Sequence, residues 1–351
     1  MTKRERFLAF ANFLPVDRIP RRASYTPPQL ERMTAFLGKD PYEYFDNDTG
    51  GGAGLTPPEG YRAPDYTVYH QEWLGNPDFS IDGNGCGHLG HGFYHFTEYI
   101  SPLRNAASFR EIEDYPLAGN ADWSDAALRT ACEQAHAAGD YAQIFVGHMY
   151  ENAWQVRGYE PFLMDLLTQR EWAELLLDRF CDNNLRTAEA AARAGYDCIA
   201  TGDDVANQNA LMFQPDLWRE VMKPRWAKVI AAARAIKPDI HVWYHSDGNV
   251  WDILDDLMEI GVTILNPVQP ECMDPIEVRK RCGTRLAFDG CMGTQSTMPF
   301  GTAEDVRRRV RELVAALDGR HGGLMLSPTH VLEPEVPPEN VAAFYDECDR
   351  I

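Results

Sequence analysis

The sequence has 351 residues, of which 44% are hydrophobic and 25% charged, values typical of a globular protein with a sizeable core. Its formal net charge of −20 disfavours nucleic acids and anionic membranes as partners, because both are bound mainly through Lys and Arg. The charged residues 1–6 are followed by no long apolar stretch, so we expect a cytoplasmic protein without a signal peptide or membrane span. The eight cysteines form no C-x-x-C pair and are expected to be thiols.

The first 140 residues differ from the rest of the chain, because they contain many Gly, Pro and aromatic residues and a flexible glycine run at 50–52. Within them, residues 25–105 are predicted to form a long irregular excursion at the mouth of the fold. The histidines His88, His91 and His95 lack the spacing of a strong ligand cluster, so we interpret their segment as a mobile loop over the mouth. Regular elements are predicted on either side: a strand at 19–24 and helices near 106–113 and 123–138.

From about residue 140 onward, short apolar runs alternate with amphipathic helical stretches, which is the pattern of parallel β-α units. The apolar runs predict strands at 142–148, 197–201, 240–245, 262–265, 285–289 and 322–326. The stretches between and after them predict helices at 170–194, 215–236, 249–260, 274–282, 302–317 and 338–350. Strands that are apolar throughout are covered on both faces, as in a sheet surrounded by helices.

These six strands and the one at 19–24 indicate a (β/α)8 TIM barrel that forms a single domain over residues 1–351. The sequence does not locate the eighth strand, and an open doubly wound sheet is the structural alternative. In a TIM barrel the active site lies at the carboxyl ends of the strands, so the residues that follow each strand are the candidates for chemistry.

His245 and Asp247 form an H-x-D pair at a strand end, where both side chains can point into the barrel mouth. His330 follows the last strand, which neighbours the first strand in a closed barrel. Two histidines, one carboxylate and an open fourth position suit a catalytic zinc ion, so a metal site is predicted at these three residues. Alternatively, Asp247 caps the following helix and His245 is a hydrogen-bonded core residue.

Asp203 and Asp204 end the preceding strand as adjacent carboxylates, and with His245 they are the predicted catalytic residues, unless they only cap a turn. Cys291, at another strand end, is a candidate fourth ligand or substrate contact, although buried cysteines are common. Trp154 is predicted to line the substrate pocket; alternatively, it is a residue of the hydrophobic core. The predicted substrate-binding residues are Tyr150, Glu151, Trp154, Gln269, Cys291 and Gln295.

The order and spacing of several motifs resemble the uroporphyrinogen decarboxylase superfamily, which includes the cobalamin-linked methyltransferases. After an opening from Arg4 to Pro20, the motifs are ENAWQVRGYEPFLMDLL at 151–167, GDDVANQ at 202–208, HSDGNV at 245–250, GVTILNPVQP at 261–270 and LSPTHVLEPEVPPEN at 326–340. The resemblance covers nearly the whole chain and implies a TIM barrel.

Two departures from the family's patterns bear on function. True decarboxylases carry Arg-Gln-Ala-Gly-Arg-Tyr near the N-terminus to neutralise the porphyrinogen carboxylates, whereas residues 20–25 here read PRRASY. The thiol-directed methyltransferases bind zinc through His-x-Cys and a later Cys, and the corresponding residues here are His245, Asp247 and His330. Because both thiolates are replaced, the resemblance favours a more electrophilic zinc that suits an ether oxygen.

The resemblance therefore implies a zinc- and cobalamin-dependent methyltransferase that moves a methyl group from a methoxylated aromatic compound to cob(I)alamin. No D-x-H-x-x-G corrinoid motif occurs in the sequence, so a separate corrinoid protein would carry the cobalamin. Three alternatives stay open: a metal-independent decarboxylase of a small carboxylic acid or of uroporphyrinogen, a methylcobalamin:thiol methyltransferase, and a non-catalytic barrel that binds a corrinoid protein.

Overall fold

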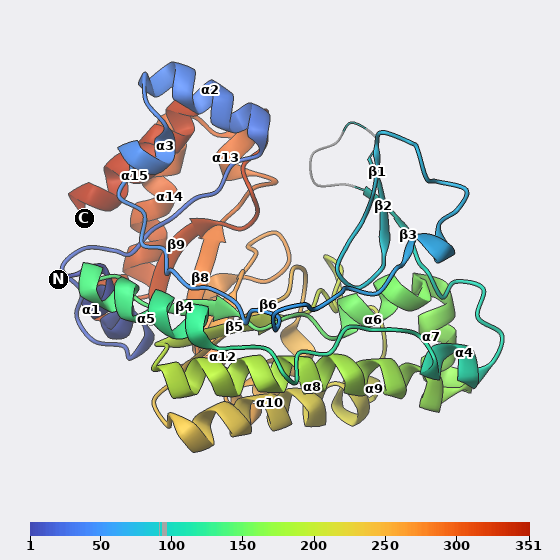
Figure 1. The fold of residues 1–351 in the computed structure, drawn as a ribbon. Coiled ribbons are helices and arrows are strands. Elements are labelled where there is room, and N and C mark those ends of the chain that lie inside the picture. The colour runs from blue at the N-terminus through green and yellow to red at the C-terminus, as the bar shows by residue number, and fades with distance from the viewer. Residues whose placement is uncertain (91, 93–96) are drawn as a thin grey trace.

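Six parallel strands form the central sheet of the computed structural model, which describes residues 1–90, 92 and 97–351. They lie in chain order and each overlaps a predicted strand (Figure 1): β4 (Gln143–Phe145), β5 (Cys198–Gly202), β6 (His241–His245), β7 (Ile264–Asn266), β8 (Ala287–Met292) and β9 (Leu324–Pro328). Most of their residues are buried, which explains why the strands read as apolar runs.

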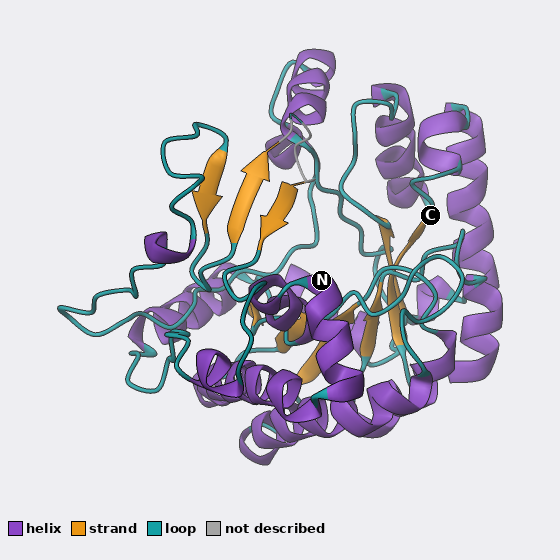
Figure 2. Ribbon diagram, turned by 90° about the vertical axis from the view of Figure 1, so that its right-hand side faces the viewer, coloured by secondary structure: helices purple, strands orange, loops and turns teal. Residues whose placement is uncertain are grey.

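Helices connect successive strands and surround the sheet (Figure 2). The first three after β4 are α6 (Tyr150–Arg157), α7 (Tyr159–Thr168) and α8 (Arg170–Ala194). Later connections hold α9 (Pro215–Val221), α10 (Lys223–Ile236), η2 (Trp251–Ile253), α11 (Leu254–Ile260), α12 (Pro275–Cys282), α13 (Thr297–Phe300), α14 (Ala303–Ala316), η3 (Gly319–His321) and α15 (Pro338–Arg350). The predicted helices of this half are confirmed, although the one at 215–236 is divided into α9 and α10.

Two short extended segments near the N-terminus close the six-stranded sheet into a TIM barrel. In the first segment, the Arg22 amide donates to a carbonyl of β9 at 3.1 Å. The Asp48 amide of the second segment donates to the Arg21 carbonyl at 2.9 Å, and the Gly51 amide donates to the carbonyl that precedes β4 at 3.1 Å. The first segment is the strand predicted at 19–24, and the second occupies the eighth position that the sequence left unassigned.

The glycine run at 50–52, which the sequence suggested to be flexible, is part of this closure. A Cβ atom on Gly50 would lie 2.4 Å from the Tyr141 ring, and one on Gly52 would lie 2.3 Å from the Gln143 carbonyl oxygen. Only glycine allows the two backbones to approach so closely.

The predicted irregular excursion at 25–105 is more regular than expected. It contains α2 (Pro27–Leu37), α3 (Pro41–Tyr44), η1 (Thr67–Tyr69) and a three-stranded antiparallel sheet of β1 (Phe79–Ile81), β2 (Gly87–Gly90) and β3 (Thr97–Ile100). This small sheet stands apart from the barrel, above α6 (Figure 1). His88 therefore lies on a strand rather than in a loop, and His91 and His95 lie outside the described residues. The helices predicted near 106–113 and 123–138 are confirmed as α4 (Phe109–Glu113) and α5 (Ala126–Ala138).

The N-terminal helix α1 (Lys3–Ala11) closes the end of the barrel opposite the mouth. Its Phe7 and Phe10 pack in one apolar cluster with side chains from the first parts of the strands, including Cys198, Ile264 and Met325. The carboxyl ends of the strands are left as the open end. No helix in the described part of the chain is long and apolar enough to cross a membrane.

Substituting the glycine run tests this closure. We expect Gly52→Ala to lower the free energy of unfolding by about 1–3 kcal/mol, because the new methyl group would collide with the Gln143 carbonyl. Gly51→Ala is the matched control, since no atom lies within 4 Å of its Cβ position, and a change within about 0.5 kcal/mol is expected. Urea unfolding followed by circular dichroism measures both, and equal losses would contradict the assignment of the eighth strand.

Candidate active site

Two adjoining cavities open at the carboxyl ends of the strands. The smaller has a volume of about 490 Å³ and the larger about 730 Å³. Both are lined by Asp204, Asp247, Thr329, His330 and Val331, so they are two parts of one mouth. This is the end of the barrel at which TIM-barrel enzymes place their chemistry.

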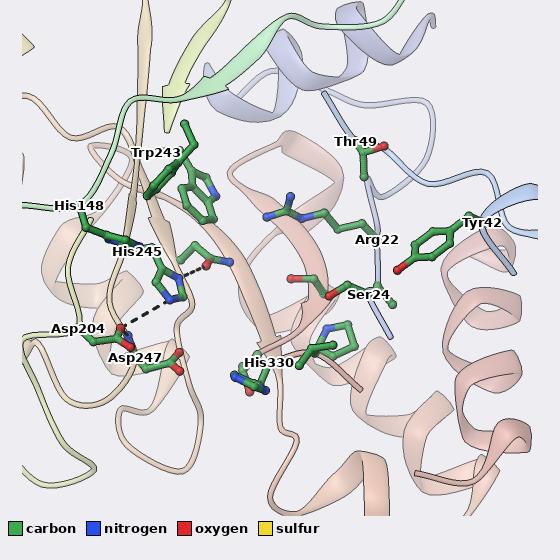
Figure 3. A pocket seen from close by; sticks show the side chains of 17 residues that line it. Arg22, Ser24, Tyr42, Thr49, His148, Asp204, Trp243, His245, Asp247 and His330 are labelled. Atoms are coloured by element: carbon green, nitrogen blue, oxygen red, sulfur yellow. Dashed lines mark hydrogen bonds and ion pairs between the residues drawn. The ribbon is translucent and has the colours of Figure 1, made fainter. Parts of the chain in front are cut away.

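Asp204, His245 and Asp247 converge where β5 and β6 end (Figure 3). One ligand atom from each lies within 4.8 Å of the other two. The Asp247 amide also donates to Asp204 Oδ1 at 2.8 Å, which holds the two carboxyl-bearing loops together. The predicted pair His245 and Asp247 is thus brought together at the mouth, with Asp204 as the third member of the group.

The orientation of the His245 ring is set by Asn266. The Asn266 amide nitrogen donates to the Asp289 carbonyl at 3.0 Å, so its oxygen faces His245 Nδ1 at 2.7 Å. Nδ1 then carries the proton, and Nε2 faces Asp204 Oδ1 at 3.6 Å, which is too far for a hydrogen bond. Burial lowers the pKa of His245, but Asp204 and Asp247 outweigh it and raise that pKa overall.

Asp247 has a buried oxygen that the described residues leave unsatisfied. No described hydrogen-bond donor reaches its Oδ1. Burial raises the pKa of this carboxyl group, whereas the neighbouring His245 opposes the rise. A buried carboxylate oxygen without a partner is costly, so a proton or a cation is needed at this point.

His330 lines both cavities but is not part of the Asp204–His245–Asp247 group. It comes from the loop after β9 and lies across the smaller cavity from His148 and Trp243 (Figure 3). The predicted zinc triad is therefore divided: two of its members lie together and the third faces them from another strand end.

The adjacent aspartates have different surroundings. Asp203 is fully buried, and its Oδ1 accepts hydrogen bonds from the amides of Met149 at 2.8 Å and Glu151 at 3.1 Å. Its Oδ2 accepts from Trp226 Nε1 at 3.2 Å. The expectation that Asp203 faces the substrate is wrong, because its side chain is buried and caps the start of α6. Asp204, in contrast, lines both cavities.

Glu151 links the larger cavity to the Asp204 loop. Its Oε2 accepts from the Asp204 amide at 3.0 Å and lies 3.0 Å from His148 Nδ1. Burial raises the pKa of Glu151, and the neighbouring His148 lowers it in part. His148 was not among the predicted site residues, although its position three residues after the end of β4 is the same signal that identified the others.

The predicted substrate contacts divide into two groups. Glu151, Trp154, Gln269 and Gln295 all line the larger cavity. Tyr150 and Cys291, in contrast, are fully buried and line neither cavity, so their prediction as substrate contacts is wrong. The Tyr150 ring packs on Phe162 and Phe213. Cys291 has a buried thiol whose pKa is raised to about 12 by desolvation.

Arg22 is the one Arg or Lys among the described residues that line the two cavities. Its guanidinium donates to Asp289 Oδ2, which also accepts from Trp243 Nε1 at 2.8 Å. The adjacent Arg21 turns away and pairs with Asp349 at 2.5 Å. Both arginines of the PRRASY segment are therefore neutralised by neighbouring carboxylates.

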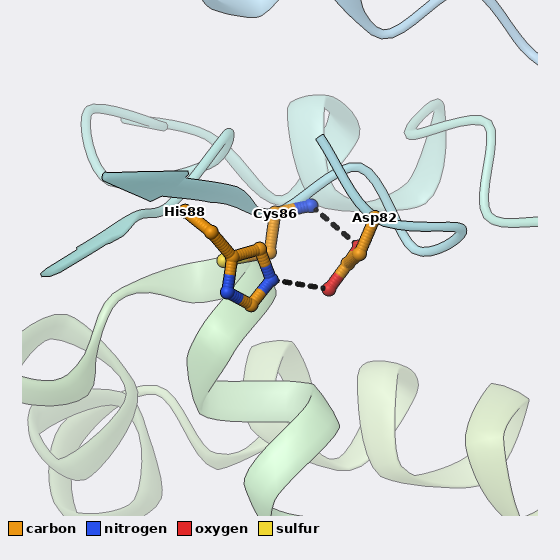
Figure 4. A group of neighbouring side chains, drawn as sticks. All are labelled: Asp82, Cys86 and His88. Atoms are coloured by element: carbon orange, nitrogen blue, oxygen red, sulfur yellow. Dashed lines mark hydrogen bonds and ion pairs between the residues drawn. The ribbon is translucent and has the colours of Figure 1, made fainter. Parts of the chain in front are cut away.

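A second group of potential ligands, Asp82, Cys86 and His88, lies on the small sheet (Figure 4). Hydrogen bonds among residues of the protein explain why these three side chains lie together. Asp82 Oδ1 accepts from the Cys86 amide at 3.0 Å, and Asp82 Oδ2 lies 3.0 Å from His88 Nε2. The other ring nitrogen of His88 lies 3.3 Å from Thr97 Oγ1. The group therefore organises the β1–β2 connection.

Comparisons with known proteins agree with this architecture. The model of the uroporphyrinogen decarboxylase (URO-D) family matches residues 126–351. Uroporphyrinogen decarboxylases of two Legionella pneumophila strains, Corby and Paris, are 24% and 25% identical over 196 residues, which are 56% of this chain. The match spans about half, 53%, of the length of these curated relatives. A solved structure of a methyltransferase from Methanosarcina mazei is similar over 100% of this chain and 99% of its own, with a TM-score of 0.67 and 19% identity.

Separate substitutions of the two aspartates test their different roles. We expect Asp203→Asn to lower the free energy of unfolding by about 1–3 kcal/mol, because the new amide group cannot accept from all three buried donors. Asp204→Asn keeps an oxygen that can accept from the Asp247 amide, so a change within about 0.5 kcal/mol is expected. Urea unfolding distinguishes the two, and a larger loss for Asp204→Asn would contradict the arrangement.

Proposed function

The chain belongs to the uroporphyrinogen decarboxylase family, and we propose that it is a methyltransferase of that family which transfers a methyl group from a small methylated donor to the cob(I)alamin of a separate corrinoid protein. The observation that carries the proposal is the Asp204–His245–Asp247 group at the mouth, with its unsatisfied buried carboxylate oxygen. The full-length fold similarity to a methyltransferase supports it.

The charges at the mouth argue against uroporphyrinogen decarboxylation. A porphyrinogen with many carboxylates needs basic side chains that are free to pair with them. Here Arg22 already binds Asp289, and five carboxylates line the larger cavity. The curated decarboxylase relatives match over only about half of their length, so their activity does not transfer on similarity alone.

The Asp204–His245–Asp247 group fits a divalent metal ion such as zinc. Imidazole and carboxylate are zinc ligands, and the ring of a ligating histidine is commonly fixed through its other nitrogen, as Asn266 fixes His245. An ion there would also satisfy Asp247 Oδ1. His330, across the mouth, is a candidate for a further ligand. When bound, zinc would supply Lewis-acid polarisation of an oxygen on the donor.

The residues around this group would bind and orient the donor. Trp154, Gln269 and Gln295 line the larger cavity and offer one aromatic surface and two amide groups. The ligand set without thiolates favours a methoxylated, aromatic donor, as the sequence suggested. A methylcobalamin:thiol methyltransferase is the second candidate, because the fold is also compatible with the other half-reaction, in which a thiol takes the methyl group from methylcobalamin.

Metal analysis tests the site. We expect roughly one zinc ion per chain in protein purified without chelator, and its loss in both His245→Ala and Asp247→Ala, because each removes a ligand from a group of three. His88→Ala is the matched control, since His88 belongs to a different group of potential ligands, on the small sheet, and it should retain the metal. Mass spectrometric metal content is the readout. Metal-free wild-type protein, or loss only in His88→Ala, would contradict the assignment.

Methyl transfer is tested with reduced free cobalamin. Wild-type protein should methylate cob(I)alamin with at least one methoxylated donor. His245→Ala should lower the rate at least about 100-fold, because it removes a proposed ligand of the metal ion. Absorbance spectra of the cobalamin follow the reaction. Activity found only from methylcobalamin to a small thiol would move the chain to the thiol-directed branch, and release of carbon dioxide from a small acid without metal would favour a decarboxylase.

A further inference from the structure

Three aromatic side chains form a corner in the larger cavity: Tyr99, Trp154 and Tyr159. The ring centroids of Tyr99 and Trp154 are 5.1 Å apart, and those of Trp154 and Tyr159 are 5.4 Å apart. In both pairs the ring planes are nearly perpendicular, at 87°. We call these residues the aromatic corner; rings at right angles present electron-rich faces in more than one direction.

The aromatic corner is assembled from two separate parts of the fold. Trp154 and Tyr159 belong to α6 and α7, whereas Tyr99 belongs to β3 of the small sheet. The rings of His88 and Tyr99 make an edge contact, with centroids 5.2 Å apart. The His88 ring is in turn held by Asp82, whose Oδ2 lies 3.0 Å from His88 Nε2 (Figure 4). Tyr159 is held as well, because its hydroxyl lies 3.1 Å from Met212 Sδ. The walls are therefore in place before a ligand arrives.

The polar lining of the same cavity is negatively charged. Its carboxylates are Glu151, Asp204, Asp247, Glu333 and Glu335, and no Lys or Arg is among its described lining residues. A divalent ion held by Asp204 and Asp247 would offset two of these charges. The chain as a whole carries a formal charge of −20. The field in this cavity favours cations and opposes anions such as benzoate derivatives.

We propose that the larger cavity is a binding site for a quaternary ammonium group, and that the methyl donor of this enzyme carries such a group. Aromatic faces attract a cation that needs no hydrogen-bond acceptor, and the carboxylates balance its charge. At about 730 Å³ the cavity has the size of a small-molecule site. The inference rests on the proposed methyltransferase function and adds the chemical class of the donor.

A pair of probes with the same shape and different charge tests the inference directly. Choline carries a trimethylammonium group, and 3,3-dimethyl-1-butanol is its uncharged isostere. Isothermal titration of wild-type protein, without any corrinoid, should show choline binding about tenfold or more tightly than the isostere. Equal affinities, or no binding of choline, would overturn the inference.

Variants of the aromatic corner locate the binding. Trp154→Leu should weaken choline binding at least about tenfold and leave the isostere almost unchanged, whereas Trp154→Phe should retain most of the affinity because it keeps a π face. Trp123→Leu is the matched control, since Trp123 packs on Tyr61 and lines neither cavity. Unchanged choline affinity in Trp154→Leu would overturn the assignment to this cavity. Should Trp154→Leu fail to fold, the wild-type comparison of the two probes decides.

Turnover separates this inference from the proposed function. Cob(I)alamin methylation is compared between trimethylammonium donors, a methoxyarene that bears a trimethylammonium group, and the same methoxyarene without it. Faster transfer from the charged donors supports the inference, and the demethylated product shows whether nitrogen or oxygen loses the methyl group. Equal transfer from the uncharged methoxyarene overturns the donor class alone. No transfer from any donor, with choline selectivity intact, overturns the proposed function and leaves a cation-binding site.

Discussion

The mouth of this barrel depends on one buried carboxylate. Asp203, at the end of β5, accepts hydrogen bonds from two amides at the start of α6 and from the Trp226 indole of α10. These bonds join a strand end to the first turn of one helix and the face of another. They fix where α6 begins, and with it the positions of Glu151 and Trp154 in the larger cavity. Hydrogen bonds to a fully buried group are costly to break, so this element is held rigidly.

The chemistry of the mouth follows from an imbalance of charge. Carboxylates gather where β5 and β6 end, while Arg22 is neutralised by Asp289. Such a site is a poor place for an anionic substrate and a good one for cations. A metal ion at Asp247 and an organic cation at the aromatic corner would each relieve part of this imbalance, at different points of the same opening. The two proposals are therefore consistent with a single electrostatic cause.

The sequence predicted the regular half of the fold because the signals there are local. Apolar runs covered on both faces mark β4 to β9, and Pro215, Pro338 and the Thr302 capping box mark helix starts. The eighth strand was missed because it pairs through backbone groups around Gly51 and has no side-chain pattern of its own. The small antiparallel sheet was missed for a similar reason, since its strands are only three or four residues long and β2 begins and ends with glycine.

At the site, the sequence by itself determined which strand ends form the mouth, because the carboxyl ends of parallel strands meet at one edge; His245, Asp247 and Trp154 lie there as predicted. Only the tertiary structure decided which way neighbouring side chains turn. Asp203 is buried because its side chain turns toward the start of α6, where it accepts a hydrogen bond from the Met149 amide. The side chain of Asp204 faces the cavities instead. Tyr99 belongs to β3 of the small sheet, and no local sequence pattern predicts that its ring lies beside that of Trp154. Contacts between remote segments depend on the folded chain, which is why they were beyond the reach of sequence periodicity.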